Sequence, residues 1–196
     1  MARKKSIKKA AETFRESADD IATFIADVSA GQSAAHITQI HDHAIIMLYR
    51  EFESLMLDCL VGAINNDSST VSSTTGIQFP KHMTDKVCEY LITGTGYFDF
   101  KGRDGLIKTL KKFVPDTHYV ITTVKQPKYK DTLERLSALR NYAAHESSVS
   151  KKAAATAVGA AKMRASGAWL KVDGRITAII AKLKELANEI EAAAPY

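Results

Sequence analysis

The chain of 196 residues has few of the residues that build disulfide-bonded, metal-binding or membrane-spanning structures. It has only two cysteines, Cys59 and Cys88, which stand among apolar residues without the close spacing of a zinc or redox motif. We expect both to be buried thiols in a reducing, cytoplasmic setting. No apolar run reaches the length of a transmembrane helix, and none follows the basic start as in a secretory signal. We therefore expect neither a secreted disulfide scaffold nor a membrane protein.

The bulk composition is that of an ordinary globular domain. Hydrophobic residues make up 45% of the chain and charged residues 25%. A chain of this length can bury a sizeable core without disulfides or metals. We predict a basic, flexible tail over residues 1–10 and a single helical domain over residues 11–196.

The net charge of +5 is distributed unevenly. Residues 1–10 carry five basic residues and no acid, so the remainder of the chain is neutral as a whole. Residues 11–60 have a net charge of −7, whereas residues 101–140 have ten basic residues against four acidic ones, a net charge of +6. The second segment suits a polyanion such as RNA. Solvated helix faces and a loose basic tail are the alternative explanation of these charges.

Apolar residues recur at helical spacing along most of the chain. The pattern predicts helices over residues 10–30, 34–64, 82–93, 105–113, 130–145, 151–165 and 168–192. Between them we predict a loop over 68–75, an irregular or short extended stretch over 97–105, and a strand or extended connector over 118–124. The predicted fold class is all-α, an up-and-down helical bundle with extra helices and at most a short extended segment.

Two further predictions concern the ends and the buried faces of these helices. Asp104 is a candidate cap for the helix over 105–113, and Ser148 or Ser150 for the helix over 151–165. The buried face of the last helix is predicted to comprise Ile176, Ile179, Ile180, Leu183, Leu186 and Ile190. In the helix predicted over residues 130–145, the predicted core residues are Leu133, Leu136 and Leu139.

The most distinctive motif is the hexapeptide Arg140-Asn141-Tyr142-Ala143-Ala144-His145, at the end of a predicted helix. An arginine is permanently cationic, and a histidine has an unperturbed pKa that allows proton exchange near neutral pH. When RNA is cleaved by its own 2′-hydroxyl, a histidine can move the proton and an arginine can stabilise the charge on the phosphate. We therefore predict Arg140 and His145 as catalytic residues that need neither a metal nor a cofactor.

Helical geometry turns this motif into a prediction about a dimer. At about 100° per residue, Arg140 lies about 140° around the helix from His145, whereas Asn141 shares the face of His145. Arg140 then either curls back to the same cleft, lies in a distorted helix or serves a partner's site. One histidine cannot easily act as both base and acid in an in-line displacement. Two motifs facing each other in a homodimer would supply both roles.

The other residues of the hexapeptide have several open roles. Asn141 is an auxiliary residue that either orients His145 or holds a phosphate oxygen. Tyr142 either stacks on a base of the substrate or is a core or interface aromatic.

The run Leu139 to Ser147 resembles the Arg-Asn-x-x-x-His block of the HEPN superfamily, in particular its RiboL-PSP-like lone HEPN domains. Upstream, Ile45 to Ser54 is similar to the early helix of such domains, where an apolar run precedes an acidic residue. The likeness extends over roughly residues 35–190. It implies metal-independent endoribonuclease activity and a homodimer that juxtaposes Arg140 with His145, with Asn141 and Glu53 as auxiliary residues.

The resemblance also implies a biological setting. Such proteins serve in toxin–antitoxin systems, phage defence or RNA processing, so an antitoxin or regulatory protein is a possible partner. Other members bind nucleotides or partners without cutting RNA. A non-catalytic helical module that binds RNA or a partner protein is therefore the alternative function.

Other polar groups are weaker candidates. Lys101 and Arg103 stand among glycines before the motif and are predicted to bind substrate phosphate, although the stretch matches no Walker pattern. The neighbouring aromatics Tyr97, Phe98 and Phe100 are expected to anchor this stretch in the core. A histidine cluster, with no cysteine nearby, is predicted to be solvent-facing or interfacial rather than metal-binding: His36, His41 and His43.

Overall fold

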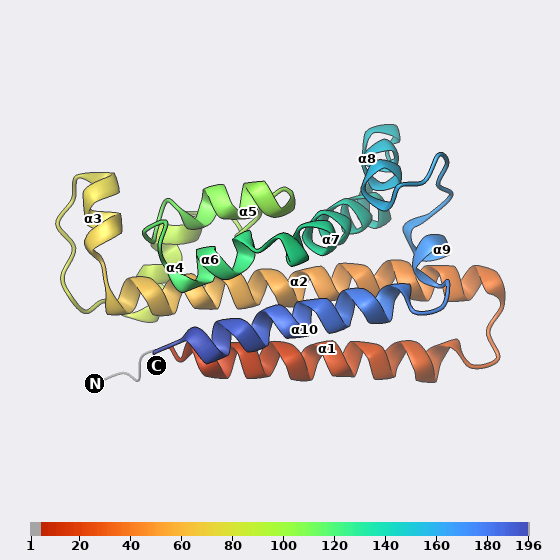
Figure 1. Ribbon diagram of the computed structural model, residues 1–196, viewed down its shortest axis with the longest axis horizontal. Helices are drawn as coiled ribbons and strands as arrows, with labels where there is room; N and C mark the ends of the chain where they lie inside the picture. The colour runs from red at the N-terminus through yellow and green to blue at the C-terminus, as the bar shows by residue number, and fades with distance from the viewer. Residues whose placement is uncertain (1–4, 196) are drawn as a thin grey trace.

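Four long helices form the framework of the protein. The computed structural model describes residues 5–195, and within this range the chain contains ten α-helices and no strand (Figure 1). The predicted all-α fold class is therefore confirmed. The long helices are α1 (Ile7–Ser29), α2 (Ala34–Asn66), α7 (Pro127–His145) and α10 (Arg175–Ala193).

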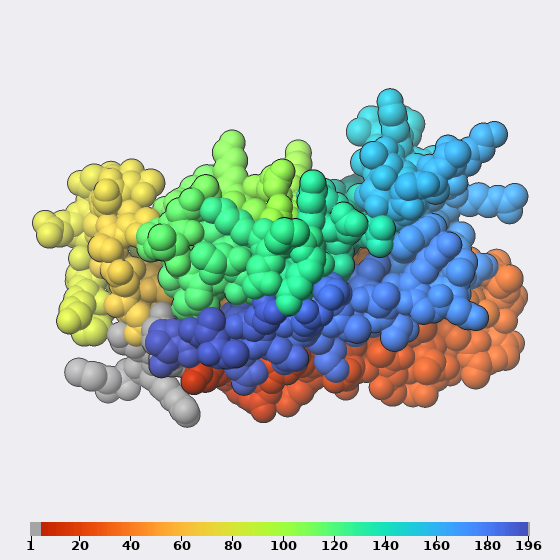
Figure 2. All heavy atoms as spheres, in the orientation of Figure 1, coloured from red at the N-terminus to blue at the C-terminus, as the bar shows by residue number. Residues whose placement is uncertain are grey.

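Contacts between the long helices establish an up-and-down arrangement. Lys184 Nζ lies 2.5 Å from Asp19 Oδ1, and Arg15 pairs with Glu191, so α10 runs antiparallel to α1. Lys128 at the start of α7 pairs with Glu185 and Glu189 near the end of α10, so these two helices are also antiparallel. The four-residue connection between α1 and α2 reverses the chain once more. On the face shown in Figure 2, α10 lies between α1 and the layer that contains α6 and α7.

Six shorter helices are inserted into this bundle. Four of them connect α2 to α7, and the other two connect α7 to α10 (Figure 1). In chain order they are α3 (Ser69–Thr75), α4 (Asp85–Thr93), α5 (Gly102–Leu110), α6 (Tyr119–Lys125), α8 (Ser148–Val158) and α9 (Ser166–Leu170).

The first helix begins earlier than the sequence pattern predicts. The Ser6 hydroxyl accepts a hydrogen bond from Lys9 N and caps α1, whose first residue, Ile7, is fully buried. Residues 7–10 are thus part of the domain rather than of the predicted tail over residues 1–10. Residues 1–4 of that tail lie outside the described range.

Two segments predicted to be non-helical are helices. The predicted strand or connector over 118–124 is α6, because burial of Val120, Ile121 and Val124 outweighs the β-preference of branched residues. The predicted loop over 68–75 contains α3, whose Val71 packs against buried residues of α2 and α4. Tertiary packing therefore overrides local preference in both places.

Three of the predicted helices also begin or end at other residues than predicted. Helix α8 is capped by Ser147 instead of Ser148 or Ser150, and it ends before Gly159. Asp104 lies inside the first turn of α5 rather than at its cap. The predicted last helix is divided into α9 and α10 by the turn that ends at Gly174.

The residues predicted to form the buried faces of the helices lie in the core. Every residue of the predicted buried face of α10 is buried, and so are Leu133, Leu136 and Leu139 of α7. Cys59 and Cys88 are buried free thiols, as predicted. Among the described helices, none is both long and apolar enough to span a membrane.

The start of α5 is fixed by side chains of α7. Gly102 N donates to Ser137 Oγ over 3.1 Å, and Arg103 N donates to Glu134 Oε1 over 2.9 Å. Gly102 has a positive φ of 62°, and a Cβ there would lie 2.6 Å from Glu134 Oε2. The segment before α5 is thereby held against α7.

Helix α9 fixes the other end of α7 against α2. Ser166 Oγ donates to Leu139 O over 2.7 Å, and Gly167 N donates to Asp42 Oδ1 over 2.6 Å. The backbones approach so closely that a Cβ at Gly167 would lie 1.9 Å from Thr38 O. Only a glycine fits at this crossing without a backbone shift.

We predict that Gly167→Ala destabilises the protein by about 1–3 kcal/mol or more, because α9 must move away from α2. Chemical denaturation followed by circular dichroism measures this loss. Gly96→Ala is the matched control, since the nearest atom to its added Cβ is 3.6 Å away, and its effect should stay within about 1 kcal/mol. An equal loss in both variants contradicts the packing argument.

Candidate functional site

The hexapeptide forms the C-terminal end of α7. Leu139, directly before the motif, and Tyr142 are buried in the core, whereas Ala144 and His145 are exposed. Glu146 follows the helix and terminates it: its backbone adopts the left-handed conformation with φ 46°, and its N–H donates a hydrogen bond to Tyr142 O. His145 is therefore the last helical residue, and it is exposed.

Arg140 is held by two contacts. Its Cζ lies 4.5 Å from the centroid of the Tyr49 ring, a cation–π geometry. Its Nη1 donates to Asn141 Oδ1 over 2.9 Å. Side chains in a helix lean towards its N-terminus, so Arg140 extends towards α2 and away from the helix end that carries His145. The guanidinium is a partly buried cation in a fixed position.

Tyr49 is itself fixed. Its side chain is only 1% exposed, its hydroxyl donates to Phe100 O over 2.8 Å, and its ring stacks on Phe100 with centroids 5.2 Å apart. The same hydroxyl lies 3.4 Å from Asp99 Oδ1. Burial, together with nearby acidic groups, raises the pKa of Tyr49, so it stays a neutral platform for Arg140.

Glu53 lies one helical turn after Tyr49 on α2 and faces the same cluster. Burial raises the pKa of its carboxyl to about 7; the Asp99 charge acts in the same direction, and Arg140 opposes it. A carboxyl with this pKa exchanges protons near neutral pH. We refer to Tyr49, Glu53, Asp99, Arg140 and Asn141 as the Arg140 cluster.

The structure brings three of the residues singled out in the sequence together in this cluster: Glu53, Arg140 and Asn141. Sequence reasoning missed the contributions of Tyr49 and Asp99. Tyr49 carried a usable signal, because its spacing of four residues from Glu53 places both on one helix face. Asp99 carried none, since a contact between a loop and two distant helices leaves no local pattern.

His145 is not part of the Arg140 cluster. It lies on the exposed side of α7, and no hydrogen bond or ion pair of its side chain is found within residues 5–195. Asn141 precedes it by one turn, but the Asn141 oxygen accepts from Arg140. Within one chain, the Arg140 guanidinium thus lies against Tyr49 and Asn141, whereas His145 is exposed and has no hydrogen bond to either of them.

The predicted substrate-binding residues have different surroundings. Tyr142 is 6% exposed, and its hydroxyl donates a hydrogen bond to Arg164 O over 2.5 Å. Of the roles left open for Tyr142, it therefore has that of a core aromatic. Arg103 donates a hydrogen bond from Nε to Val124 O over 3.0 Å and another to Lys125 O. Its guanidinium is therefore bound to the last carbonyl groups of α6. Lys101, directly before α5, is exposed.

The basic segment over residues 101–140 is partly neutralised by ion pairs. Lys111 and Lys125 both pair with Asp116, whose charge is already included in the net value of the segment. Lys128 pairs with Glu185 and Glu189 of α10, whose charges lie outside the segment and are not included in that value. The net charge of +6 in this segment therefore overstates the positive potential of its surface. Arg140 belongs to the Arg140 cluster, and the exposed Lys101 follows Asp99 by two residues in the sequence.

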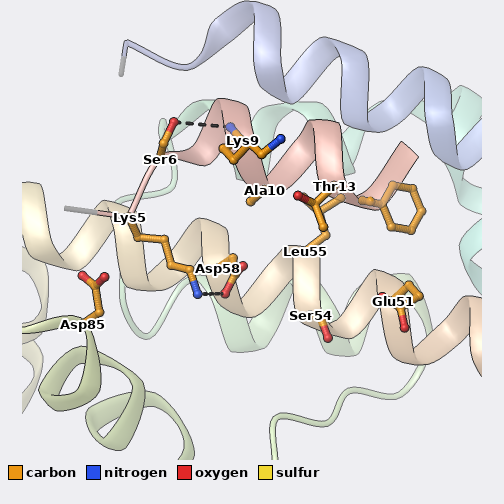
Figure 3. A pocket seen from close by; sticks show the side chains of 11 residues that line it. Lys5, Ser6, Lys9, Ala10, Thr13, Glu51, Ser54, Leu55, Asp58 and Asp85 are labelled. Atoms are coloured by element: carbon orange, nitrogen blue, oxygen red, sulfur yellow. Dashed lines mark hydrogen bonds and ion pairs between the residues drawn. The ribbon is translucent and has the colours of Figure 1, made fainter. Parts of the chain in front are cut away.

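A groove of about 560 Å³ lies elsewhere, between the start of α1 and the middle of α2 (Figure 3). Its wall contains the Lys5–Asp58 ion pair at 2.5 Å, together with Lys9, Glu51 and Asp85. Charges of both signs line it, and the side chains that face each other already neutralise part of that charge. No residue of the Arg140 cluster lines this groove.

The histidine cluster does not converge. His41 and His43 each place Nδ1 near the carbonyl oxygen four residues earlier on α2, and His36 Nδ1 lies 3.2 Å from Gln32 Oε1. Of these, only His41 is buried. Within the described part of the chain, no group of three or more histidine, cysteine, aspartate or glutamate side chains has a geometry suited to a metal ion.

Comparisons with protein-family models, curated proteins and solved structures find no match to this chain.

We predict that Glu53 makes stability depend on pH. The carboxyl has a pKa of about 7 in the folded protein and an ordinary value of 4.5, so the unfolded state ionises first. As pH rises from about 4.5 to 7, the folded state loses stability relative to the unfolded state, and the loss is complete above 7. In urea denaturation, the stability of Glu53→Gln relative to wild type should therefore rise over this range.

The matched control is Glu89→Gln, which changes an exposed glutamate on α4. A difference between Glu53→Gln and wild type that stays constant from pH 4.5 to 8 contradicts the assignment.

Proposed function

We propose that the protein is a metal-independent endoribonuclease that cleaves RNA at a site composed from two copies of the chain. One observation carries the proposal: α7 holds the Arg140 guanidinium in place against the ring of Tyr49, while its last residue, His145, remains exposed. A fixed cation and an accessible proton-transfer group on one helix are what this reaction requires. The resemblance of the hexapeptide to HEPN ribonucleases supports the same reading.

In the proposed reaction, the 2′-hydroxyl oxygen attacks the adjacent phosphorus and the bond to the 5′-oxygen breaks. The products are a 2′,3′-cyclic phosphate and a free 5′-hydroxyl. One His145 accepts the proton of the 2′-hydroxyl, and the partner's His145 donates a proton to the departing oxygen. Arg140 stabilises the additional negative charge on the phosphorane, and Asn141 acts as a positioning residue for Arg140 through their hydrogen bond.

The geometry within one chain favours a site shared by two copies. Arg140 lies against Tyr49 and Asn141, His145 is exposed without a hydrogen bond to either of them, and the motif supplies one histidine per chain. A two-fold axis next to the end of α7 would place both motifs in one cleft. The family resemblance further suggests a role as a toxin or phage-defence effector, with an antitoxin or regulatory protein as partner.

We predict that the purified protein cleaves a mixed-sequence single-stranded RNA in EDTA, and that Arg140→Ala and His145→Ala each lower the rate by about 10²–10³. Gel analysis of end-labelled RNA measures the rates. DNA of the same sequence should stay intact because it lacks the 2′-hydroxyl.

The matched controls are Arg50→Ala and His82→Ala, which remove an exposed arginine and an exposed histidine outside the motif and should cleave like wild type. Absence of cleavage by wild type, or equal cleavage by all variants, overturns the proposal.

We predict a steeper-than-linear loss of activity when wild type is mixed with His145→Ala and the subunits are allowed to exchange. If each site needs two copies of His145, an equal mixture keeps about one quarter of the wild-type activity, because only that fraction of random dimers is intact. Independent sites in each chain keep about one half. The rate of RNA cleavage as a function of the mixing ratio distinguishes the two cases.

A second candidate function is RNA binding without cleavage. It is favoured by the observation that the His145 side chain has no orienting hydrogen bond within residues 5–195. RNA binding that persists in wild type, Arg140→Ala and His145→Ala, with no cleavage products from any of them, supports this alternative.

A further inference from the structure

The segment before α5 has an alternating pattern of buried and exposed side chains. Phe98 and Phe100 are buried, whereas Tyr97, Asp99 and Lys101 are exposed. This period of two is that of an extended chain, and the backbone at Lys101 is extended. Only two of the three aromatics predicted to anchor the segment therefore do so, since Tyr97 is 96% exposed.

The C-terminal end of this segment is held beside the Arg140 cluster. The ring of Phe100 stacks on the ring of Tyr49, and the backbone carbonyl oxygen of Phe100 accepts a hydrogen bond from the Tyr49 hydroxyl. The same Tyr49 ring carries the guanidinium of Arg140. At the far end, Gly102 N is bound to Ser137 of α7. The backbone at Phe100 and Gly102 is thus anchored beside Arg140, and Tyr97 stands three residues before this anchor.

An aromatic ring as exposed as Tyr97 contributes little to folding. Burial of a large aromatic side chain is a main source of stability, and the two neighbouring aromatics in this segment are buried. Exposed aromatic rings are surfaces on which proteins stack unpaired bases of single-stranded RNA. The exposed Lys101 lies four residues further, about 13 Å along an extended chain.

We propose that Tyr97 and Lys101 form a subsite for single-stranded RNA next to the Arg140 cluster, with the Tyr97 ring stacked on an unpaired base and Lys101 bound to a phosphate. The proposal rests on the function proposed above and specifies its substrate as unpaired RNA. The Asp99 carboxylate between them lies 3.4 Å from the Tyr49 hydroxyl and so faces the cluster. An unpaired strand fits better than a duplex, because bases within a duplex are already stacked on one another.

Binding is tested in the His145→Ala background, so that the RNA stays intact. The probe is a fluorescein-labelled, mixed-sequence, 12-nucleotide single-stranded RNA, and its affinity is measured by fluorescence anisotropy. Tyr97→Ala should weaken binding by roughly 5- to 100-fold, whereas Tyr97→Phe, which keeps the ring, should stay within about twofold of the parent. Binding of a blunt RNA duplex should be unchanged by either substitution.

The matched control is Tyr90→Ala, which removes another tyrosine, 61% exposed, on α4. It should leave the affinity unchanged. Circular dichroism and the thermal midpoint verify that each variant is folded; because Tyr97 is almost fully exposed, both should match the parent.

Several outcomes overturn the proposal: no measurable binding of the single strand by the parent, equal affinity for the parent and Tyr97→Ala, or an equal loss in Tyr90→Ala. A change in oligomeric state in Tyr97→Ala, with unchanged RNA affinity, overturns it in favour of a protein contact. Dependence of binding on Tyr97 without any cleavage by wild type leaves this subsite in place and rejects only the proposed nuclease. Cleavage without any role of Tyr97 rejects only the subsite.

Discussion

The buried ring of Tyr49 joins three parts of the chain that are far apart in sequence. Tyr49 belongs to α2, and its ring contacts Phe100 in the segment before α5 and Arg140 near the end of α7. The hydroxyl adds a hydrogen bond to the Phe100 backbone. Because α2 is packed against α1, α4, α7 and α9, the position of this ring is determined by the whole bundle. The arrangement of the proposed site therefore depends on the core.

The fold was predictable from the sequence to the extent that helical periodicity reports burial. The stripes around Leu133 and Ile179 are buried as predicted because each consists of several apolar residues on one face. The segment over 118–124 was not predictable, since its branched residues favour a strand locally and become helical by packing. The two hydrogen bonds that hold the start of α5 could not be foreseen either, because their acceptors, Glu134 and Ser137, belong to another helix.

The candidate site was predictable only in part, for a related reason. Local spacing was enough to place the hexapeptide at the end of a helix, whereas the contact of Arg140 with Tyr49 joins two helices that are far apart in the sequence. The raised pKa of Glu53 depends on burial and on charges that lie far away in the sequence. The same holds for charge: acidic residues of α10 neutralise Lys128, which the sequence shows only as part of a basic segment. Interactions over long sequence separations thus account for most of what the sequence left open.

The contact between Tyr49 and Arg140 also has a consequence for biosynthesis. Residues 49 and 140 meet only after α7 has docked on α2, so the chain must be synthesised at least as far as the end of α7 before the guanidinium reaches its place. Contacts of such sequence separation form late in folding because closing a long loop costs entropy. For a protein proposed to cut RNA, the order matters: the growing chain stays close to its own messenger and to ribosomal RNA. If the proposed activity holds, Arg140 would reach its place in the site only after α7 has been synthesised and has docked on α2.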